Sequence, residues 1–380
     1  MIYADHAATT PLLPAAAAAM EACRAARPGN PASAHSAGRR AAALLENARH
    51  RLAAAVGATP REVVFTSGGT EADNLALRGA AALGAAAGKR HLIASAIEHH
   101  AVLRTLEALA EEGFSVTLLP PGADGVLPAE AVAGALREDT ALVSVMLANN
   151  ELGTLQPVAR LAALCRARGA LLHTDAVQAV GQVPVSFAGL GADMLSLSAH
   201  KFGGPRGAGA LLCREGLRLP PMLRGGGQEN GRRAGTEHLE GAVGMAAALK
   251  AACGQMEENA ARVGALRRRL CGRLLSRRGV EIRLLGHPQQ RLPGIAAFLL
   301  PGMSGEEMLL RLDLRGICVS AGAACATGEP GPSHVLEALG IPARQAQNGL
   351  RVSFGAGNTV EEADAIAEAI LGVLEGAFWR

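Results

Sequence analysis

From about residue 62 onward, the chain alternates short runs of β-forming residues with helical patterns. The runs are, in order, EVVFT, HLIAS, SVTLL, ALVSVML, ALLHT, ADMLSLS and GALLC, and helix-forming segments such as 157–168 separate several of them. This alternation predicts an α/β domain built on a mainly parallel sheet. Ligands bind such a sheet at the carboxyl ends of its strands, so we expect the functional side chains to follow the strands directly.

After about residue 237 the pattern changes. A long helical stretch reaches residue 275 or so, and strands are expected at GIAAFLL, ICVSA and LRVSF, with helices over 305–313 and from Val360 onward. These elements predict a second, smaller α+β domain. We therefore expect a large domain over 15–255 and a small domain made of 1–14 and 256–380.

Composition argues against several classes of function. The 380 residues carry 37 Lys and Arg against 34 Asp and Glu, and these charges are dispersed. With one Trp, one Tyr and seven Phe, the chain has little to stack on single-stranded bases, so neither a nucleic acid nor a membrane partner is expected. No leader and no apolar run of about 18 residues is visible, which favours the cytoplasm.

Seven cysteines are spread along the chain, and none forms a C-x2-C pair with zinc-ligand spacing. An odd number of cysteines in a large chain without a leader also argues against a disulfide framework. We therefore expect no metal site, and most of these cysteines to be small buried residues.

Lys201 has the most specific setting. It lies in SLSAHKFGGPRG, after an apolar strand and before a glycine turn, with Ser198 and His200 beside it. Most lysines point into water. A lysine at the end of a buried strand is instead a candidate Schiff-base former, because desolvation lowers the pKa of its amine.

Asp175 follows another apolar strand, in LLHTDAVQAVG. It could simply cap a helix. Beside a Schiff-base lysine, however, an acidic residue suits the protonated pyridine nitrogen of pyridoxal phosphate, and Gln178 could reach the phenolic oxygen of that cofactor.

Three further segments also place candidate residues directly after expected strands. In FTSGGTEADNLAL, Gly69 and Thr70 could bind a phosphate at a helix N-terminus, although ordinary capping would explain the pattern too. His99, in SAIEHHAVL, could stack on a cofactor ring and transfer protons, or could be a loop residue. Asn150, in MLANNELGT, could contact a ring substituent or serve as a turn residue.

Two residues near the end of the chain have unusual neighbours. Arg351, in GLRVSFG, lies inside an apolar strand, where it would either bind a substrate carboxylate or close an internal salt bridge. Cys325 lies in VSAGAACATGEPGP, among glycines and small side chains that give it little to pack against. We expect this segment to be a mobile arm.

Together these segments resemble the NifS/IscS-type cysteine desulfurases, which are pyridoxal-phosphate enzymes of the class V aminotransferase group. The likeness runs almost from end to end, from YADHAATTP through SLSAHKFGGPRGAGAL and GGGQENGRRAGTEH to SAGAACATG and LRVSFG. It implies a fold type I enzyme, a homodimer, L-cysteine as substrate, and a sulfur-acceptor protein such as an iron–sulfur scaffold as partner.

The resemblance also implies roles for residues at matching positions. Cys325 would accept the sulfur, Lys201 would bind the cofactor covalently, and His99 would stack on its ring and transfer protons. Arg351 would bind the substrate carboxylate, and Asn150 would contact the cofactor or substrate. The remaining cofactor contacts would be Gly69, Thr70, Asp175, Gln178, Ser198 and His200, with Thr236 reaching the phosphate of the partner subunit.

Two positions depart from the family pattern. Ala323 stands where a serine is usual, and Ala356 with Gly357 stands where a second arginine is usual. The alternatives left open are a selenocysteine lyase, another class V aminotransferase or lyase, and a non-enzymatic sulfur-transfer scaffold.

Overall fold

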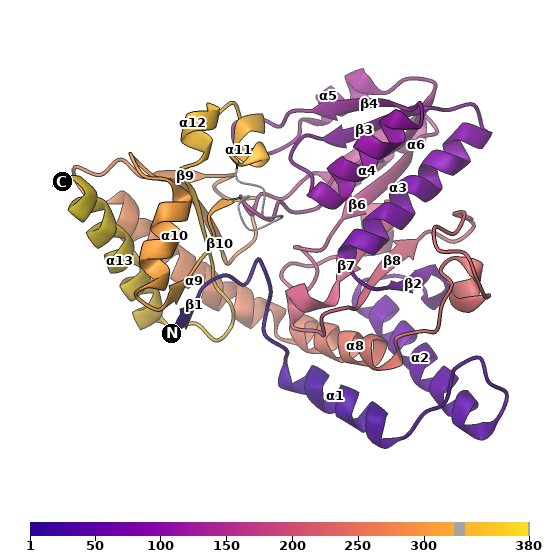
Figure 1. Cartoon of the computed structure of the whole chain (residues 1–380). Helices are drawn as coiled ribbons and strands as arrows, with labels where there is room; N and C mark the ends of the chain where they lie inside the picture. The colour runs from indigo at the N-terminus through magenta and orange to yellow at the C-terminus, as the bar shows by residue number, and fades with distance from the viewer. Residues whose placement is uncertain (323–330, 379–380) are drawn as a thin grey trace.

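The computed structural model describes residues 1–322 and 331–378, with side chains to residue 376. All seven strands expected in the first part of the chain form one sheet (Figure 1), in the order β2-β8-β7-β6-β5-β3-β4. Their bounds are β2 Val63–Thr66, β3 His91–Ser95, β4 Ser115–Leu119, β5 Thr140–Ser144, β6 Leu171–Asp175, β7 Met194–Ser198 and β8 Gly209–Cys213. Only β8 is antiparallel to its neighbours. The predicted α/β class and mainly parallel seven-stranded sheet are therefore confirmed.

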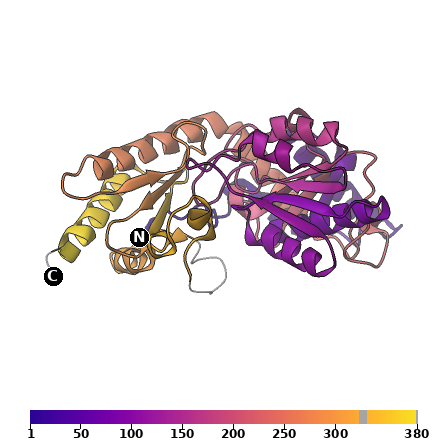
Figure 2. The ribbon, with the colours of Figure 1, turned by 90° about the horizontal axis from the view of Figure 1, so that it is seen from above.

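Helices cover both faces of this sheet, as the view from above shows (Figure 2). Their bounds are α1 Pro14–Ala25, α2 Ser36–Ala55, α3 Gly69–Ala86, α4 His100–Glu111, α5 Ala129–Ala135, α6 Val158–Ala167, α7 Phe187–Leu190 and α8 Leu239–Gly254. One core cluster joins α3 and α4 to one face of the sheet, and another joins α2, α6 and α8 to the opposite face. Successive strand residues alternate between the clusters: Val63 and Phe65 belong to one and Val64 to the other. This alternation is the two-residue period of a strand that is buried on both faces.

The C-terminal part builds a separate apolar core around β10 (Ile295–Leu299), β12 (Gly349–Ser353), α9 (Met256–Leu275) and α13 (Val360–Phe378). Strand β10 lies between β12 and β9 (Arg283–Leu285), antiparallel to both. The shorter helices are α10 Gly305–Asp313, α11 His334–Ala338 and α12 Ala343–Ala346. The expected continuous helix to residue 275 is interrupted at Gln255, whose backbone (φ −114°, ψ 10°) leaves the helical region between α8 and α9. No helix within the described ranges is long and apolar enough to cross a membrane.

The first residues of the chain lie with this C-terminal part (Figure 1). Strand β1 (Ile2–Tyr3) pairs in parallel with β11 (Ile317–Cys318), and Asp5 forms a bridge with Ser353. The chain then crosses to α1 in the large domain. The division into a large domain over 15–255 and a small domain made of 1–14 and 256–380 stays a prediction.

A buried ion pair anchors the loop that follows β8. Both terminal nitrogens of the Arg49 guanidinium donate to the Glu229 carboxylate at 2.8 Å. The Phe65 backbone N–H donates to the same carboxylate at 2.9 Å. The two side chains are 7% and 2% exposed. Removal of the Glu229 charge would leave Arg49 buried, with Glu46, whose side chain is 55% exposed, as its remaining carboxylate partner.

Glu229→Ala is therefore expected to lower the free energy of unfolding by about 3–5 kcal/mol, measured by urea denaturation followed by circular dichroism. Glu307→Ala is the control, because it removes an ion pair with Arg311 whose side chains are 49% and 43% exposed. This control should cost less than about 1 kcal/mol. Similar losses in the two variants would contradict the structural importance of the buried pair.

Candidate active site

A cavity of about 300 Å³ lies where the carboxyl ends of the parallel strands face the N-terminal segment and the small domain. Its walls include ten of the residues proposed from the sequence, namely Gly69, Thr70, His99, Asn150, Asp175, Gln178, Ser198, His200, Lys201 and Arg351. Each of these except Arg351 follows or ends a strand of the large sheet. The structure thus brings together residues that are up to 282 positions apart.

Lys201 lies on the short 3-10 helix Ala199–Phe202, directly after β7. Its Nζ donates to the backbone oxygens of Ala7 at 2.6 Å and Ala8 at 3.0 Å. Burial, with a smaller contribution from the Arg351 guanidinium, lowers the pKa of Lys201 to about 8. A substantial fraction of this amine is therefore neutral near pH 7 to 8, as nucleophilic attack requires.

Lys201 is one of only three lysines in the chain, with Lys89 and Lys250. Neither of the other two lines the cavity. The Lys89 ammonium donates to the Gly169 carbonyl at 2.6 Å, and Lys250 is exposed on α8. Lys201 is thus the one lysine placed for chemistry in this cavity.

Asp175 is the last residue of β6 and is only 6% exposed. Its Oδ1 accepts a hydrogen bond from the Val177 N–H at 2.8 Å. This bond closes a local turn and not the helix cap considered from the sequence, because the next helix begins only at Phe187. Burial raises the pKa of Asp175 to about 6, although the nearby Lys201 ammonium acts in the opposite direction. A cation placed against this carboxyl group would therefore keep it ionised.

Two buried carboxyl groups near Asp175 were not found from the sequence. Burial raises the pKa of both Asp73 and Glu98 well above the usual value, and the charge of Asp175 adds to the effect in each case. Asp73 belongs to the segment FTSGGTEADNLAL, in which ordinary helix capping was the alternative to a phosphate site. Its burial could not be read from FTSGGTEADNLAL, because Asp73 faces inward one turn after the start of a helix.

The start of α3 forms a cradle of small residues. A Cβ atom added at Gly69 would lie 2.8 Å from Val177 Cγ2 and 3.6 Å from Ser198 Cβ. Gly68, the N-cap, has no side chain to occupy the free N–H groups of the first turn. Thr70 and His200 line the same cavity, so a phosphate could be bound here by helix N–H groups and hydroxyl groups.

His99 is the N-cap of α4. Its Nδ1 accepts a hydrogen bond from the Ala101 N–H at 3.1 Å, which in the neutral ring leaves the proton on Nε2. Burial and the Lys201 ammonium lower the pKa of His99 to about 4. The ring is thus neutral near pH 7, and protonation of both nitrogens would require the Ala101 hydrogen bond to break.

The two neighbouring asparagines have different roles. Asn149 is fully buried, and its Oδ1 accepts from the N–H groups of Glu151 at 2.9 Å and Leu152 at 2.8 Å, so Asn149 is the turn residue. Asn150 lines the cavity instead.

Gln178 also lines the cavity. Its Nε2 donates to the Ala7 oxygen at 2.9 Å, while its buried Oε1 has no hydrogen-bond partner in the described part of the chain.

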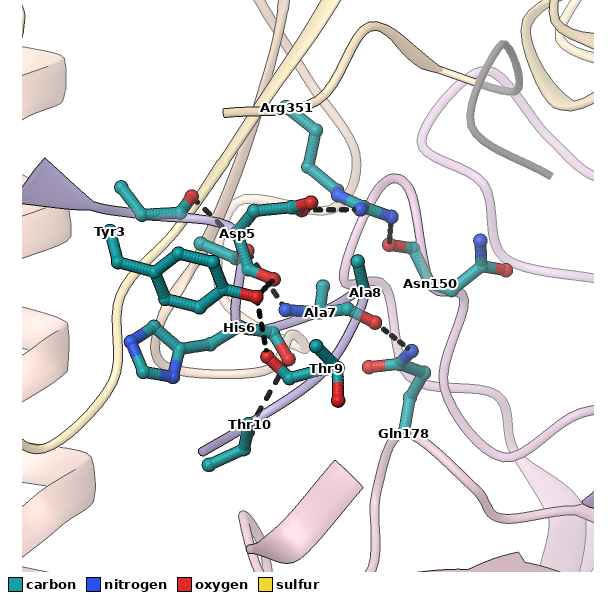
Figure 3. A network of polar contacts seen from close by, with 12 residues as sticks. Tyr3, Asp5, His6, Ala7, Ala8, Thr9, Thr10, Asn150, Gln178 and Arg351 are labelled. Carbon is teal, nitrogen blue, oxygen red and sulfur yellow. Dashed lines mark hydrogen bonds and ion pairs between the residues drawn. The ribbon is translucent and has the colours of Figure 1, made fainter. Parts of the chain in front are cut away.

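Arg351 makes the internal salt bridge that was one of its two predicted roles (Figure 3). Its Nη2 donates to Asp5 Oδ1 at 2.8 Å, and its Nη1 donates to the Asn150 backbone oxygen at 2.9 Å. The buried Nε has no partner among the residues described. Since Arg351 also lines the cavity, its guanidinium retains donors for a bound anion.

The contribution of the N-terminal segment was missed from the sequence, apart from its expected place in the small domain. In Figure 3, Asp5, Ala7 and Thr9 belong to the same polar network as Arg351 and Gln178. The Tyr3 hydroxyl donates to the Thr9 oxygen at 2.8 Å. Much of what this segment supplies is backbone oxygen, which no sequence motif identifies.

One proposed site residue lies apart from this cavity. Thr236 is exposed and lines a separate cavity of about 100 Å³. Cys325 and Ala323 lie outside the described residues. Ala356 and Gly357 are exposed, and the Ala356 oxygen accepts from Arg262 at 2.7 Å. No cluster of three or more metal-binding side chains was found within residues 1–322 and 331–378.

Comparisons with known proteins agree with this geometry. The chain is 45% identical to an IscS-like cysteine desulfurase of Mycobacterium tuberculosis, covering 100% of this chain and 97% of the relative. It is 41% identical to cysteine desulfurase IscS of Dictyoglomus turgidum, covering 98% and 94%. A solved structure described as a NifS-like protein superimposes with a TM-score of 0.91 at 36% identity, covering 98% of this chain and 99% of that one.

The family profile for class-V aminotransferases matches residues 2–366, which is nearly the whole chain. The matched range therefore spans all the strands of the large sheet and most of the small domain. On these grounds the chain belongs to the aminotransferase class-V family.

Proposed function

We propose that this chain is a pyridoxal-phosphate-dependent cysteine desulfurase, which removes sulfur from L-cysteine, releases L-alanine and holds the sulfur on Cys325. The observation that carries the proposal is the single cavity in which Lys201, Asp175 and Arg351 meet. The names of the relatives support it and do not favour a selenocysteine lyase or another aminotransferase.

The residues present fit pyridoxal phosphate. The glycine cradle at the start of α3 has room for a phosphate but not for a side chain at Gly69. Asp175 is a buried carboxyl group that makes no salt bridge within the described part of the chain, although the Lys201 ammonium lies nearby. Gln178 retains an unpaired buried oxygen and a second amide hydrogen. When bound, the cofactor supplies an aldehyde that condenses with amines and a pyridine ring that withdraws electrons.

Asp175 would hold the proton on the pyridine nitrogen. A positive nitrogen beside the buried carboxyl group lowers the pKa of Asp175 and keeps it ionised. Gln178 would donate its second amide hydrogen to the phenolic oxygen. Ser198, His200, Thr70 and the N–H groups near Gly69 would bind the phosphate.

Lys201 would bind the cofactor covalently through Nζ and, once displaced by the substrate amine, would accept the substrate α-proton. Its pKa of about 8 leaves the amine ready for both roles near neutral pH. His99 Nε2 holds a proton in the resting chain because the Ala101 N–H occupies Nδ1. His99 would therefore stack on the ring and hydrogen-bond through Nε2.

Arg351 would bind the substrate carboxylate while Asp5 holds its guanidinium in place. Asp5 and the Asn150 oxygen each occupy one amine of the guanidinium, which fixes the plane of the group before substrate arrives. With no second arginine at Ala356 or Gly357, carboxylate binding depends chiefly on Arg351.

The partners and location belong to the same proposal. Thr236 would reach the phosphate site of a second subunit, which fits its exposure away from the main cavity of its own chain. Size-exclusion chromatography of the cofactor-loaded protein tests this, since a loaded monomer would contradict it. We further propose a cytoplasmic location and transfer of the sulfur to an acceptor protein such as an iron–sulfur scaffold.

The function is tested most simply by tagging the cofactor lysine. Borohydride reduction of the yellow protein should fix the cofactor to the peptide that contains Lys201, detected by mass spectrometry. Lys201→Ala should lose the tag and the release of alanine from L-cysteine, while Lys250→Ala should keep both. A tag on Lys89 or Lys250, or no alanine from the wild-type protein, would contradict the proposal.

Arg351→Lys should raise the KM for L-cysteine between about tenfold and a hundredfold, because a lysine cannot reproduce the planar guanidinium. The cofactor absorbance should stay nearly unchanged. Arg262→Lys is the matched control, since Arg262 contacts the Ala356 oxygen at the surface. An unchanged KM in Arg351→Lys would mean that Arg351 only pairs with Asp5.

A further inference from the structure

Three histidines occupy one side of the cavity. His99 and His100 come from the start of α4 in the large domain, and His334 begins α11 in the C-terminal part. The ring centroids of His100 and His334 are 4.6 Å apart, and those of His99 and His100 are 6.4 Å apart. The proposed function uses only His99.

The tautomer of His334 follows from its surroundings. Its Nε2 lies 3.0 Å from the Glu98 backbone oxygen. A carbonyl oxygen can only accept, so Nε2 carries the hydrogen and Nδ1 carries a lone pair in the neutral ring. Burial lowers the pKa of His334, although the Glu98 oxygen acts in the opposite direction, so the ring is neutral near pH 7.

The Nδ1 atom of His334 is buried and has no hydrogen-bond partner among the described residues. An acceptor left unpaired in this way costs about 1–3 kcal/mol. Such a cost is usual where a ligand supplies the missing partner. His334 lines the same cavity as Lys201 and Arg351, so a ligand bound in that cavity would lie beside it.

A buried carboxylate holds His334 in place through the preceding residue. The Ser333 hydroxyl donates to Glu151 Oε2 at 2.6 Å, and Ser333 also caps α11 through the Leu336 N–H. Glu151 is 4% exposed and lines the cavity as well. The position of His334 is therefore fixed by two contacts. Glu98 binds its ring directly, and Glu151 binds the hydroxyl of the neighbouring Ser333.

The polar groups of the substrate indicate what the histidine side of the cavity would contact. L-Cysteine has a carboxylate, an amine and a thiol, and the first two are taken by Arg351 and the Lys201 side of the cavity. The third must face another wall. His99 Nδ1 already accepts from Ala101, so it offers no lone pair there. His334 Nδ1 is a buried acceptor that remains, and a neutral thiol has one hydrogen to donate.

We propose that His334 is a specificity-determining residue, which accepts a hydrogen bond from the thiol of bound L-cysteine at Nδ1. This inference rests on the proposed function and assigns the side-chain end of the same substrate. It predicts that cysteine binds more tightly than amino acids of similar size without a thiol, because these would leave Nδ1 buried and unpaired.

Two variants separate the ring nitrogens. Glutamine at position 334 keeps an N–H near Nε2 for the Glu98 oxygen and removes the acceptor at Nδ1. Asparagine keeps an acceptor near Nδ1 and loses the donor to Glu98. The matched pair therefore distinguishes loss of thiol recognition from loss of the structural hydrogen bond.

Binding is measured by the change in cofactor absorbance in a Cys325→Ser background, where sulfur removal is expected to stop. His334→Gln should raise the dissociation constant for L-cysteine about tenfold and leave that for L-alanine within about twofold. His334→Asn should bind L-cysteine more tightly than His334→Gln. Equal weakening for both ligands, or no weakening for L-cysteine, would overturn the assignment.

A second readout needs neither cofactor nor turnover. Nitrogen-15 chemical shifts of His334 in the cofactor-free chain should show an unprotonated Nδ1 and a protonated Nε2 at neutral pH. The opposite tautomer would overturn the inference. Continued alanine release in the Cys325→Ser protein would instead contradict the proposed function, so the two failures are distinguishable.

Discussion

The N-terminal segment ties the active site together through two contacts. The Lys201 ammonium donates to the backbone oxygens of Ala7 and Ala8, and the Asp5 carboxylate pairs with Arg351. The first contact joins the segment to the large sheet, and the second joins it to β12 in the small domain. The lysine that would bind the cofactor and the arginine that would bind the substrate are thus oriented by one short stretch of chain.

Burial then sets the chemistry of the groups oriented in this way. It lowers the pKa of Lys201 to about 8 and of His99 to about 4, and raises that of Asp175 to about 6. Each shift favours the neutral form of its group, as expected where water is excluded. An arriving cation or anion would therefore strongly change the protonation of these side chains. This suits a site that binds a charged cofactor and a charged amino acid.

Much of this arrangement could be predicted from the sequence. Because parallel strands place their carboxyl ends at one edge, the segments ending in Asp175 and leading to His99, Asn150 and Lys201 could be expected to meet there, and they do. The pairing of Lys201 with Asp175 already suggested pyridoxal phosphate, and the resemblance of these segments to a family implied the same cofactor. Sequence reasoning also left Arg351 with two possible roles, and the structure shows that its ion pair and its place in the cavity occur together.

What the sequence could not provide were contacts that depend on backbone atoms and on distant burial. The oxygens of Ala7 and Ala8 carry no side-chain signature, and Asp73 and Glu98 look like helix-start or loop acids until the fold buries them. The break at Gln255 was missed although Gly254, directly before it, is a residue type that often ends helices. His334 Nδ1 stands out only when the Glu98 oxygen is known to occupy Nε2.

The central claim is that sulfur from L-cysteine is transferred to Cys325, and mass spectrometry after a single turnover tests it most directly. The account predicts an added mass of about 32 Da, one sulfur atom, on the peptide that contains Cys325. The other six cysteines should stay unmodified, because four of the six are buried in the cores and none lines the cavity. An added sulfur on Cys318, or full sulfur release by Cys325→Ser, would contradict the account.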